Sequence, residues 1–270
     1  MHMTEVFTYL SIYLACGVVS GILAGLLGVG GGLVIVPMLI FIFPLQGVPA
    51  ELVQLMALGT SLATIVITSI SSFRAHDKRG AVRWDIWRAI TPGILVGTFG
   101  GGFVAAVLPV TVLRTFFVCF LYYIALQMFL DFKPKASRHL PGLIGMSGVG
   151  GVIGVVSSLV GIGGGSLSVP FMGYCNVPMH TAVGTSAAIG LPIAVAGTLS
   201  FIWNGLSVPN LPPYSLGYVS LIALAGIASA SYCTAPLGAK LAHALPISQL
   251  KRFFAFFLVC IATRMLWTML

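Results

Sequence analysis

Charged side chains are scarce in this chain. Lys, Arg, Asp and Glu make up 7% of its 270 residues, whereas hydrophobic residues make up 58%. A soluble domain carries about 25% charged residues, so a soluble globular fold is excluded. Several apolar runs match the ~20 residues that span a bilayer as a helix. These runs are Val6–Leu27, Leu52–Phe73, Ile90–Leu108, Val112–Leu130, Thr181–Trp203 and Leu250–Leu270.

The chain also lacks the alternation of polar and apolar residues that marks a membrane β-barrel, whose strands run for ~10 residues each. Its 33 glycines suit close helix packing and broken helices in lipid. The sequence therefore predicts an all-α polytopic membrane protein.

Acidic side chains are rarer than basic ones, with five Asp and Glu in total. Asp77, Asp85 and Asp131 lie among basic residues, and Glu5 and Glu51 lie near the ends of apolar runs. A proton relay in the membrane is usually built on a carboxylate or histidine within a spanning segment. No carboxylate has that position here, so the sequence does not require proton coupling.

Groups of residues typical of enzymes are missing too. The five cysteines show no Cys-x-x-Cys spacing, and no two of the five histidines stand at metal-ligand spacing. We therefore expect no catalytic residues, no metal and no cofactor. A membrane subunit of a primary pump remains an alternative, but it would need a separate ATPase because this chain has no nucleotide-binding motif.

Eleven of the 13 Lys and Arg lie in three short clusters between apolar runs. The clusters contain Arg74, Lys78, Arg79, Arg83 and Arg88, then Lys133, Lys135 and Arg138, then Lys240, Lys251 and Arg252. This is the pattern of basic residues retained on the cytoplasmic face. The net charge of +8 therefore indicates membrane topology and not binding to nucleic acid.

Two halves of the chain resemble each other. A Gly-x-Gly-Gly-Gly motif followed by proline occurs at residues 28–37 and again at 161–170. A Gly-Thr-Ser triplet occurs at 59–61 and at 184–186, and a Leu-Pro pair precedes a basic residue and two phenylalanines at 108–117 and 245–254. The matches keep their order, so we predict two homologous transmembrane repeats over residues 1–132 and 140–270, joined by a charged cytoplasmic linker at 133–139.

The relative orientation of the repeats depends on the short apolar runs Leu33–Phe43 and Leu167–Tyr174. If each short run crosses the membrane, each repeat makes five passes, the second repeat is inverted, and all three basic clusters face the cytoplasm. If each run is re-entrant, each repeat makes four passes, and the third basic cluster lies outside. The positive-inside rule favours inversion, with about eight long helices and two glycine-broken half-helices.

The glycine motifs are the candidate binding elements. Each glycine costs about 1 kcal/mol relative to alanine inside a helix, and unwound backbone in a membrane survives where protein buries it or where it lines a cavity. A helix that starts after such a break directs free N–H groups and the positive end of its dipole at the break, which suits an anion. The alternative is a tight helix crossing. The candidate glycines are Gly30, Gly31, Gly32, Gly163, Gly164 and Gly165.

Hydroxyl side chains accompany both motifs. Ser166 follows the second motif directly, and Thr60, Ser61, Thr185 and Ser186 belong to the two triplets. These hydroxyls either bind the anion with the glycines or cap and pack neighbouring helices. Because the triplets recur beside the glycine motifs, the sequence favours the ligand.

With these motifs the chain resembles the sulfite exporter TauE/SafE family, also called the toluene sulfonate uptake permeases. The resemblance covers nearly the whole length and includes the loop Arg74–Trp84 and the segment Gly217–Phe254. In the loop, this chain has Arg83 where the family often has Asp. The resemblance implies a transporter in the bacterial inner membrane for sulfur-containing anions such as sulfite, sulfoacetate or other organosulfonates, with export as the commonest direction.

We therefore expect a secondary transporter that exports small sulfur-containing anions and holds its substrate between the two repeats. The alternative is a channel or membrane subunit for other small organic anions. The expected partners are a small anionic substrate and the lipid bilayer, with no nucleic acid, and a homodimer is compatible with the sequence.

Overall fold

The computed structural model describes residues 3–27, 31–130, 139–244 and 247–269. Its first half contains α1 (Met3–Leu27), α2 (Gly32–Leu45), α3 (Ala50–Asp77), α4 (Trp84–Val107) and α5 (Val110–Phe129). Its second half contains α6 (Leu143–Val160), α7 (Gly165–Tyr174), α8 (Met179–Gly205), the short strands β1 (Ser215–Leu216) and β2 (Val219–Ser220), α9 (Leu221–Ala244) and α10 (Ile247–Trp267). Gly30 and most of the predicted linker, residues 133–138, lie outside the described residues.

The prediction of a helical polytopic membrane protein is confirmed. Five helices are long and apolar enough to cross a membrane in the described part of the chain, namely α3, α4, α5, α6 and α8. The described parts of α1 and α9 hold shorter apolar segments, and α2 is a short apolar helix of 14 residues. The number of spans and their inversion remain predictions.

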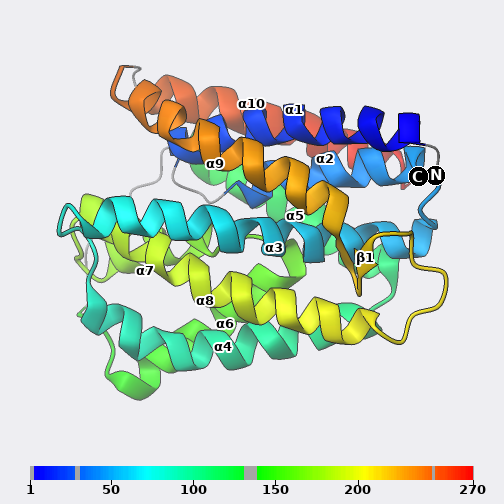
Figure 1. Cartoon of the computed structure of the whole chain (residues 1–270). Coiled ribbons are helices and arrows are strands. Elements are labelled where there is room, and N and C mark those ends of the chain that lie inside the picture. The colour runs from blue at the N-terminus through cyan, green and yellow to red at the C-terminus, as the bar shows by residue number, and fades with distance from the viewer. Residues whose placement is uncertain (1–2, 28–30, 131–138, 245–246, 270) are drawn as a thin grey trace.

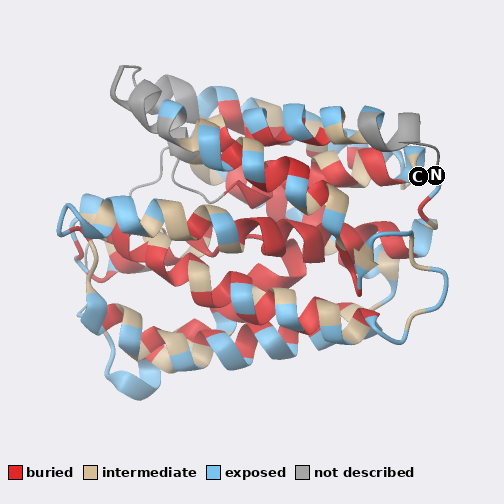
Figure 2. Ribbon diagram, in the orientation of Figure 1, coloured by how far each residue is buried: buried red, intermediate tan, exposed pale blue. Residues whose placement is uncertain are grey.

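The helices form a bundle with α3 and α8 at its centre (Figure 1). The pair α1 and α9 packs on one side of this centre, and the pair α4 and α6 packs on the other. Buried residues run along α3 and the middle of α8, whereas the outer helices alternate buried and exposed residues (Figure 2). The two central helices are therefore enclosed by the rest of the bundle.

Glycines allow the outer helix pairs to pack closely. A Cβ on Gly97 of α4 would lie 2.2 Å from the carbonyl oxygen of Gly151 in α6, and one on Gly17 of α1 would lie 2.6 Å from that of Ile227 in α9. Hydroxyls support the second seam, where Ser20 Oγ lies 2.9 Å from Ser231 Oγ. Small residues that bring helix backbones together are typical of helix association in membranes.

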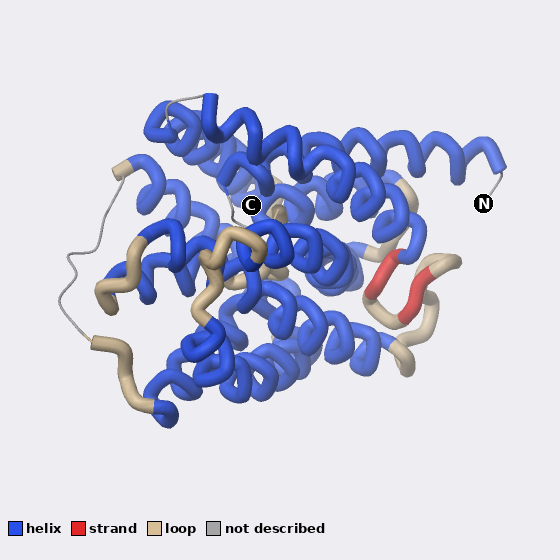
Figure 3. The backbone as a smooth tube through the Cα atoms, turned by 60° about the vertical axis from the view of Figure 1, so that its left-hand side comes forward, coloured by secondary structure: helices blue, strands red, loops and turns tan. Residues whose placement is uncertain are grey.

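The ends of the bundle differ in charge. α3 ends and α4 begins at one end, and the basic residues Arg74 to Arg88 of the first cluster lie there (Figure 1). α9 ends and α10 begins at this same end. The β1–β2 hairpin lies at the opposite end, which we call the hairpin end (Figures 1 and 3). The start of α3 lies there too (Figure 1).

Candidate functional site

The glycine directly before each short helix, Gly31 or Gly164, adopts the same conformation. Gly31 precedes α2 with φ 75° and ψ −21°, and Gly164 precedes α7 with φ 76° and ψ −7°. This left-handed region is open to glycine and costs other residues roughly 1–2 kcal/mol. Both sequences therefore need glycine at this position, and Gly32 and Gly165 then begin the helices as predicted.

Each short helix leaves its first N–H groups free of an acceptor within the helix. The carbonyl oxygen of Gly31 accepts from Val34 and Ile35, and that of Gly164 accepts from Leu167 and Ser168 at 2.8–3.0 Å. The N–H groups of the first two residues of a helix have no intrahelical partner. In α2 these residues are Gly32 and Leu33, and in α7 they are Gly165 and Ser166. Such ends carry partial positive charge.

The two breaks meet inside the bundle. A Cβ on Gly32 would lie 2.5 Å from the carbonyl oxygen of Gly161 and 3.0 Å from the Cα atom of Ile162. Gly163 lies between the two central helices, since its Cβ would stand 3.2 Å from Ile65 of α3 and 3.8 Å from Gly190 of α8. Gly32, Gly163, Gly164 and Gly165 are all buried. The structure thus brings together motifs that are 133 residues apart in the sequence.

The serines of the two triplets contact the second break. Ser61 Oγ donates to the carbonyl oxygen of Gly161 at 2.8 Å. Ser186 Oγ lies 2.8 Å from Ser168 Oγ, which also donates to the Gly164 carbonyl oxygen at 2.9 Å. α3 and α8 therefore each place one triplet serine against the second break or the helix that follows it.

Two other hydroxyls at the second break have no partner. Ser166 is 9% exposed and Ser157 is 0% exposed, and neither Oγ makes a hydrogen bond within the described residues. Ser166 is the second residue of α7, and Ser157 Oγ would lie 3.6 Å from a Cβ on Gly164. A buried hydroxyl without a partner is costly. The second break therefore has two hydroxyl groups that could bind a ligand.

The triplet threonines contact connecting segments. Thr60 Oγ1 accepts from the N–H of Ser220 at 3.0 Å, and Thr185 Oγ1 accepts from the N–H of Arg83 at 2.9 Å. Both threonines are 0% exposed. Each threonine of one half thus contacts the extended segment that precedes a helix of the other half.

The triplet glycines make the matching contact. A Cβ on Gly59 would lie 2.7 Å from the carbonyl oxygen of Tyr218, and one on Gly184 would lie 2.4 Å from that of Ala81. The segments that they contact, residues 80–83 and 217–220, both begin with a Gly-x-Val sequence, and Gly80 and Gly217 both have positive φ. The Gly-x-Val sequence is only three residues long, so the sequence alone did not mark this pair as a repeat.

The same turn also ends both short helices. Gly47 after α2 and Asn176 after α7 have positive φ, and each is followed by Val-Pro. The N–H of Val48 donates to the Phe43 carbonyl oxygen at 3.1 Å, and that of Val177 donates to the Met172 carbonyl oxygen at 3.0 Å. α2 and α7 therefore begin and end in the same way.

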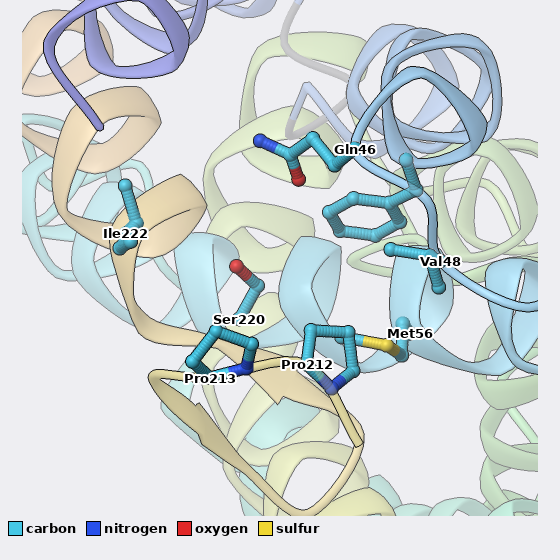
Figure 4. A pocket seen from close by; sticks show the side chains of 8 residues that line it. Gln46, Val48, Met56, Pro212, Pro213, Ser220 and Ile222 are labelled. Carbon is cyan, nitrogen blue, oxygen red and sulfur yellow. The ribbon is translucent and has the colours of Figure 1, made fainter. Parts of the chain in front are cut away.

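A small cavity lies at the hairpin end, between the loop after α2 and the segment around Pro212 and Ser220 (Figure 4). Gln46 and Val48 of that loop line the cavity together with Met56 of α3. Its volume of about 40 Å³ is enough for two or three waters, at roughly 10–15 Å³ each. This cavity is therefore too small to hold a substrate.

Comparison with known proteins identifies relatives of the whole chain. The family model described as "Sulfite exporter TauE/SafE" matches residues 13–265. A "Probable membrane transporter protein" of Haemophilus influenzae is 41% identical over 264 residues, which cover 96% of this chain and 98% of that protein. A probable membrane transporter protein of Methanocaldococcus jannaschii is 30% identical over 80% of each chain. No solved structure gives a significant match to the chain.

Proposed function

The chain belongs to the sulfite exporter TauE/SafE family of membrane transporters, and from this premise we propose that it exports small sulfur-containing anions. The substrate class is sulfite and organosulfonates of the sulfoacetate type. The anion is held between the two halves of the chain, where the glycine breaks meet. The observation that carries this proposal is the contact of Gly32 with the carbonyl oxygen of Gly161.

The polar groups at the breaks suit an oxyanion. The free N–H groups at the starts of α2 and α7 donate hydrogen bonds, and the dipoles of both helices favour negative charge there. The unpartnered hydroxyls of Ser157 and Ser166 add donors. No Asp or Glu lies in the central parts of α3 and α8, so no carboxylate there repels the ligand.

An inverted-repeat mechanism is part of this proposal. Transporters with inverted repeats hold their substrate where the two halves meet, often at broken helices, and expose it by moving one half against the other. The paired contacts of Thr60 with Ser220 and of Thr185 with Arg83 support such symmetry. By the positive-inside rule we assign the basic end of the bundle to the cytoplasm and the hairpin end to the outside. We also assign the protein to the inner membrane.

The membrane potential alone can drive export. A monovalent anion that leaves a negative interior gains roughly 2.3 kcal/mol per 100 mV. In the described helices no carboxylate lies at the middle of a candidate span. We therefore propose that a potential is sufficient and that a proton gradient is not required.

Flux into proteoliposomes of the purified chain tests this function. Sulfite, sulfoacetate, chloride and acetate are each offered under an imposed potential and, separately, under an imposed pH gradient. Sulfite or sulfoacetate flux that follows the potential and exceeds chloride and acetate flux supports the proposal. Flux that needs the pH gradient would contradict the driving force, and equal flux of all four anions would instead indicate an unselective anion channel.

A further inference from the structure

Gln54 of α3 is a buried amide that has no partner among the described residues. The residue is 0% exposed, and neither its Nε2 nor its Oε1 atom makes a hydrogen bond in that part of the chain. Nearly all buried polar side chains in folded proteins are satisfied, and an amide that can donate two hydrogen bonds and accept two is an expensive exception. A hydrophobic residue of similar size would fill this place at lower free energy, so the amide calls for another explanation.

Gln54 lies on the face of α3 that contacts the glycine breaks. Leu58 lies 3.0 Å from the Cβ position of Gly161, Ser61 donates to the Gly161 carbonyl oxygen, and Ile65 lies 3.1 Å from the Cβ position of Gly32. Gln54 precedes Leu58 by four residues and Ser61 by seven, so it shares their face. It lies roughly 10 Å nearer the hairpin end than Ser61, at 1.5 Å per residue.

Arg114 of α5 contacts this same part of α3. Its Nη2 donates to the carbonyl oxygen of Ala50 at 3.0 Å, and Ala50 lies one turn before Gln54 on the same face. Its Nε is buried and has no hydrogen-bond partner within the described ranges. The one ion pair in the described residues joins Arg83 and Asp85. Arg114 therefore forms no ion pair there, even with Glu51, which follows Ala50 in the sequence.

We propose that Gln54 and Arg114 form a second anion-binding position, on the hairpin side of the glycine breaks. This inference rests on the proposed anion transport. Its ligand is a small oxyanion such as sulfite, which accepts from the Gln54 amide and from the Arg114 Nε–H. Gln54 Oε1 can accept from the hydroxyl of a protonated oxyanion. The residue of α8 that corresponds to Gln54 through the triplets is Met179, which is 53% exposed, so this position exists on one side of the breaks only.

Gln54→Leu tests the amide, with Gln46→Leu as the matched control. Gln46 lies at the same end of the bundle (Figure 4), but its Oε1 accepts from Tyr13 at 2.8 Å. We expect Gln54→Leu to raise the melting temperature in detergent, because it removes unpaired polar atoms, and to weaken sulfite binding about tenfold or more. Gln46→Leu is expected to lower the melting temperature, because it leaves the Tyr13 hydroxyl unpaired.

Arg114→Gln and Arg114→Lys test the charge. Arg114→Gln should weaken sulfite binding at low salt by about tenfold, and the loss should shrink as ionic strength rises because salt screens the charge. Arg114→Lys keeps the charge and should retain part of the affinity, although it lacks the planar donor fork of arginine.

Sulfite binding is measured by the shift in melting temperature against chloride at equal ionic strength, separately from flux. A wild-type chain that shows no sulfite shift, or a Gln54→Leu variant that melts lower and binds sulfite as the wild type does, overturns the inference. Weaker binding by both Gln54→Leu and Arg114→Gln supports it. If the wild type binds sulfite but moves none of the tested anions, the proposed function fails while the binding data still decide the site.

Discussion

The carbonyl oxygen of Gly161 lies 2.5 Å from the position that a Cβ atom on Gly32 would occupy. The start of α2 and the glycine motif before α7 are therefore in direct backbone contact. A real Cβ atom essentially never stands so close to a backbone oxygen, so the two breaks can meet in this way only because residue 32 is glycine.

Gly32→Ala is expected to separate the two breaks. The added methyl group must displace backbone, which costs about 1–3 kcal/mol in a packed interior. We expect a lower melting temperature in detergent and a loss of anion flux. Gly173→Ala in α7 is the control, since no atom lies within 4 Å of its Cβ position. Equal flux in both variants would show that the contact is not needed for transport.

Gly31→Ala and Gly164→Ala are expected to be strained at the backbone, because both positions have a φ near 75°. The cost of the left-handed conformation is roughly 1–2 kcal/mol for a residue with a Cβ. Gly47→Ala controls for this cost, since Gly47 has φ 74° and no atom within 4 Å of its Cβ position. We expect all three variants to lose stability and only the first two to lose flux. Loss of flux in Gly47→Ala as well would trace the effect to general destabilisation.

Ser166→Ala is expected to weaken anion binding without lowering stability. Its hydroxyl has no partner in the described chain, and a hydrogen bond to a charged ligand is worth about 1.5–3 kcal/mol, or at least tenfold in affinity. Ser168→Ala is the control, because the Ser168 hydroxyl already makes hydrogen bonds with Gly164 and Ser186. This substitution should therefore lower the melting temperature. Thermal melting and titration with sulfite would check both variants. Unchanged sulfite affinity in Ser166→Ala would remove this hydroxyl from the site.

Thr60→Val and Thr185→Val are expected to lower stability by about 1–3 kcal/mol each, because the N–H groups of Ser220 and Arg83 would lose their acceptors. Thr→Ser at both positions keeps the oxygen and should restore most of the stability. Melting curves of the four variants give this comparison. If the threonines also bind the anion through their hydroxyl proton, the valine variants will bind sulfite more weakly and the serine variants will recover it.

The sequence predicted the helical membrane fold because apolar composition and run length act locally. Lipid requires every backbone polar group to be paired within the protein, and only helices fit the runs observed here. The repeated Gly-x-Gly-Gly-Gly motif predicted two helix starts, and both were confirmed at Gly32 and Gly165. Gly30 lies outside the described residues, so its role remains a prediction.

The roles of the hydroxyls could not be read from the motif alone. Thr60 and Ser61 are neighbours in sequence, but they lie about 100° apart around α3. One therefore faces Ser220 and the other faces Gly161. The sequence favoured a ligand for both, while the contact of Thr60 with the opposite half depends on where the β1–β2 hairpin packs.

Gln54 and Arg114 show the same limit more clearly. Nothing in the sequence marks Gln54, which is one glutamine in an apolar run, and the sequence favoured an interfacial position for the Arg114 side chain. The sequence by itself determined that this chain is a helical membrane protein with two broken helices, because hydropathy and glycine act over a few residues. Only the tertiary structure decided that the breaks meet, and which polar atoms remain unpaired beside them. Those properties depend on packing between segments that lie far apart in the sequence.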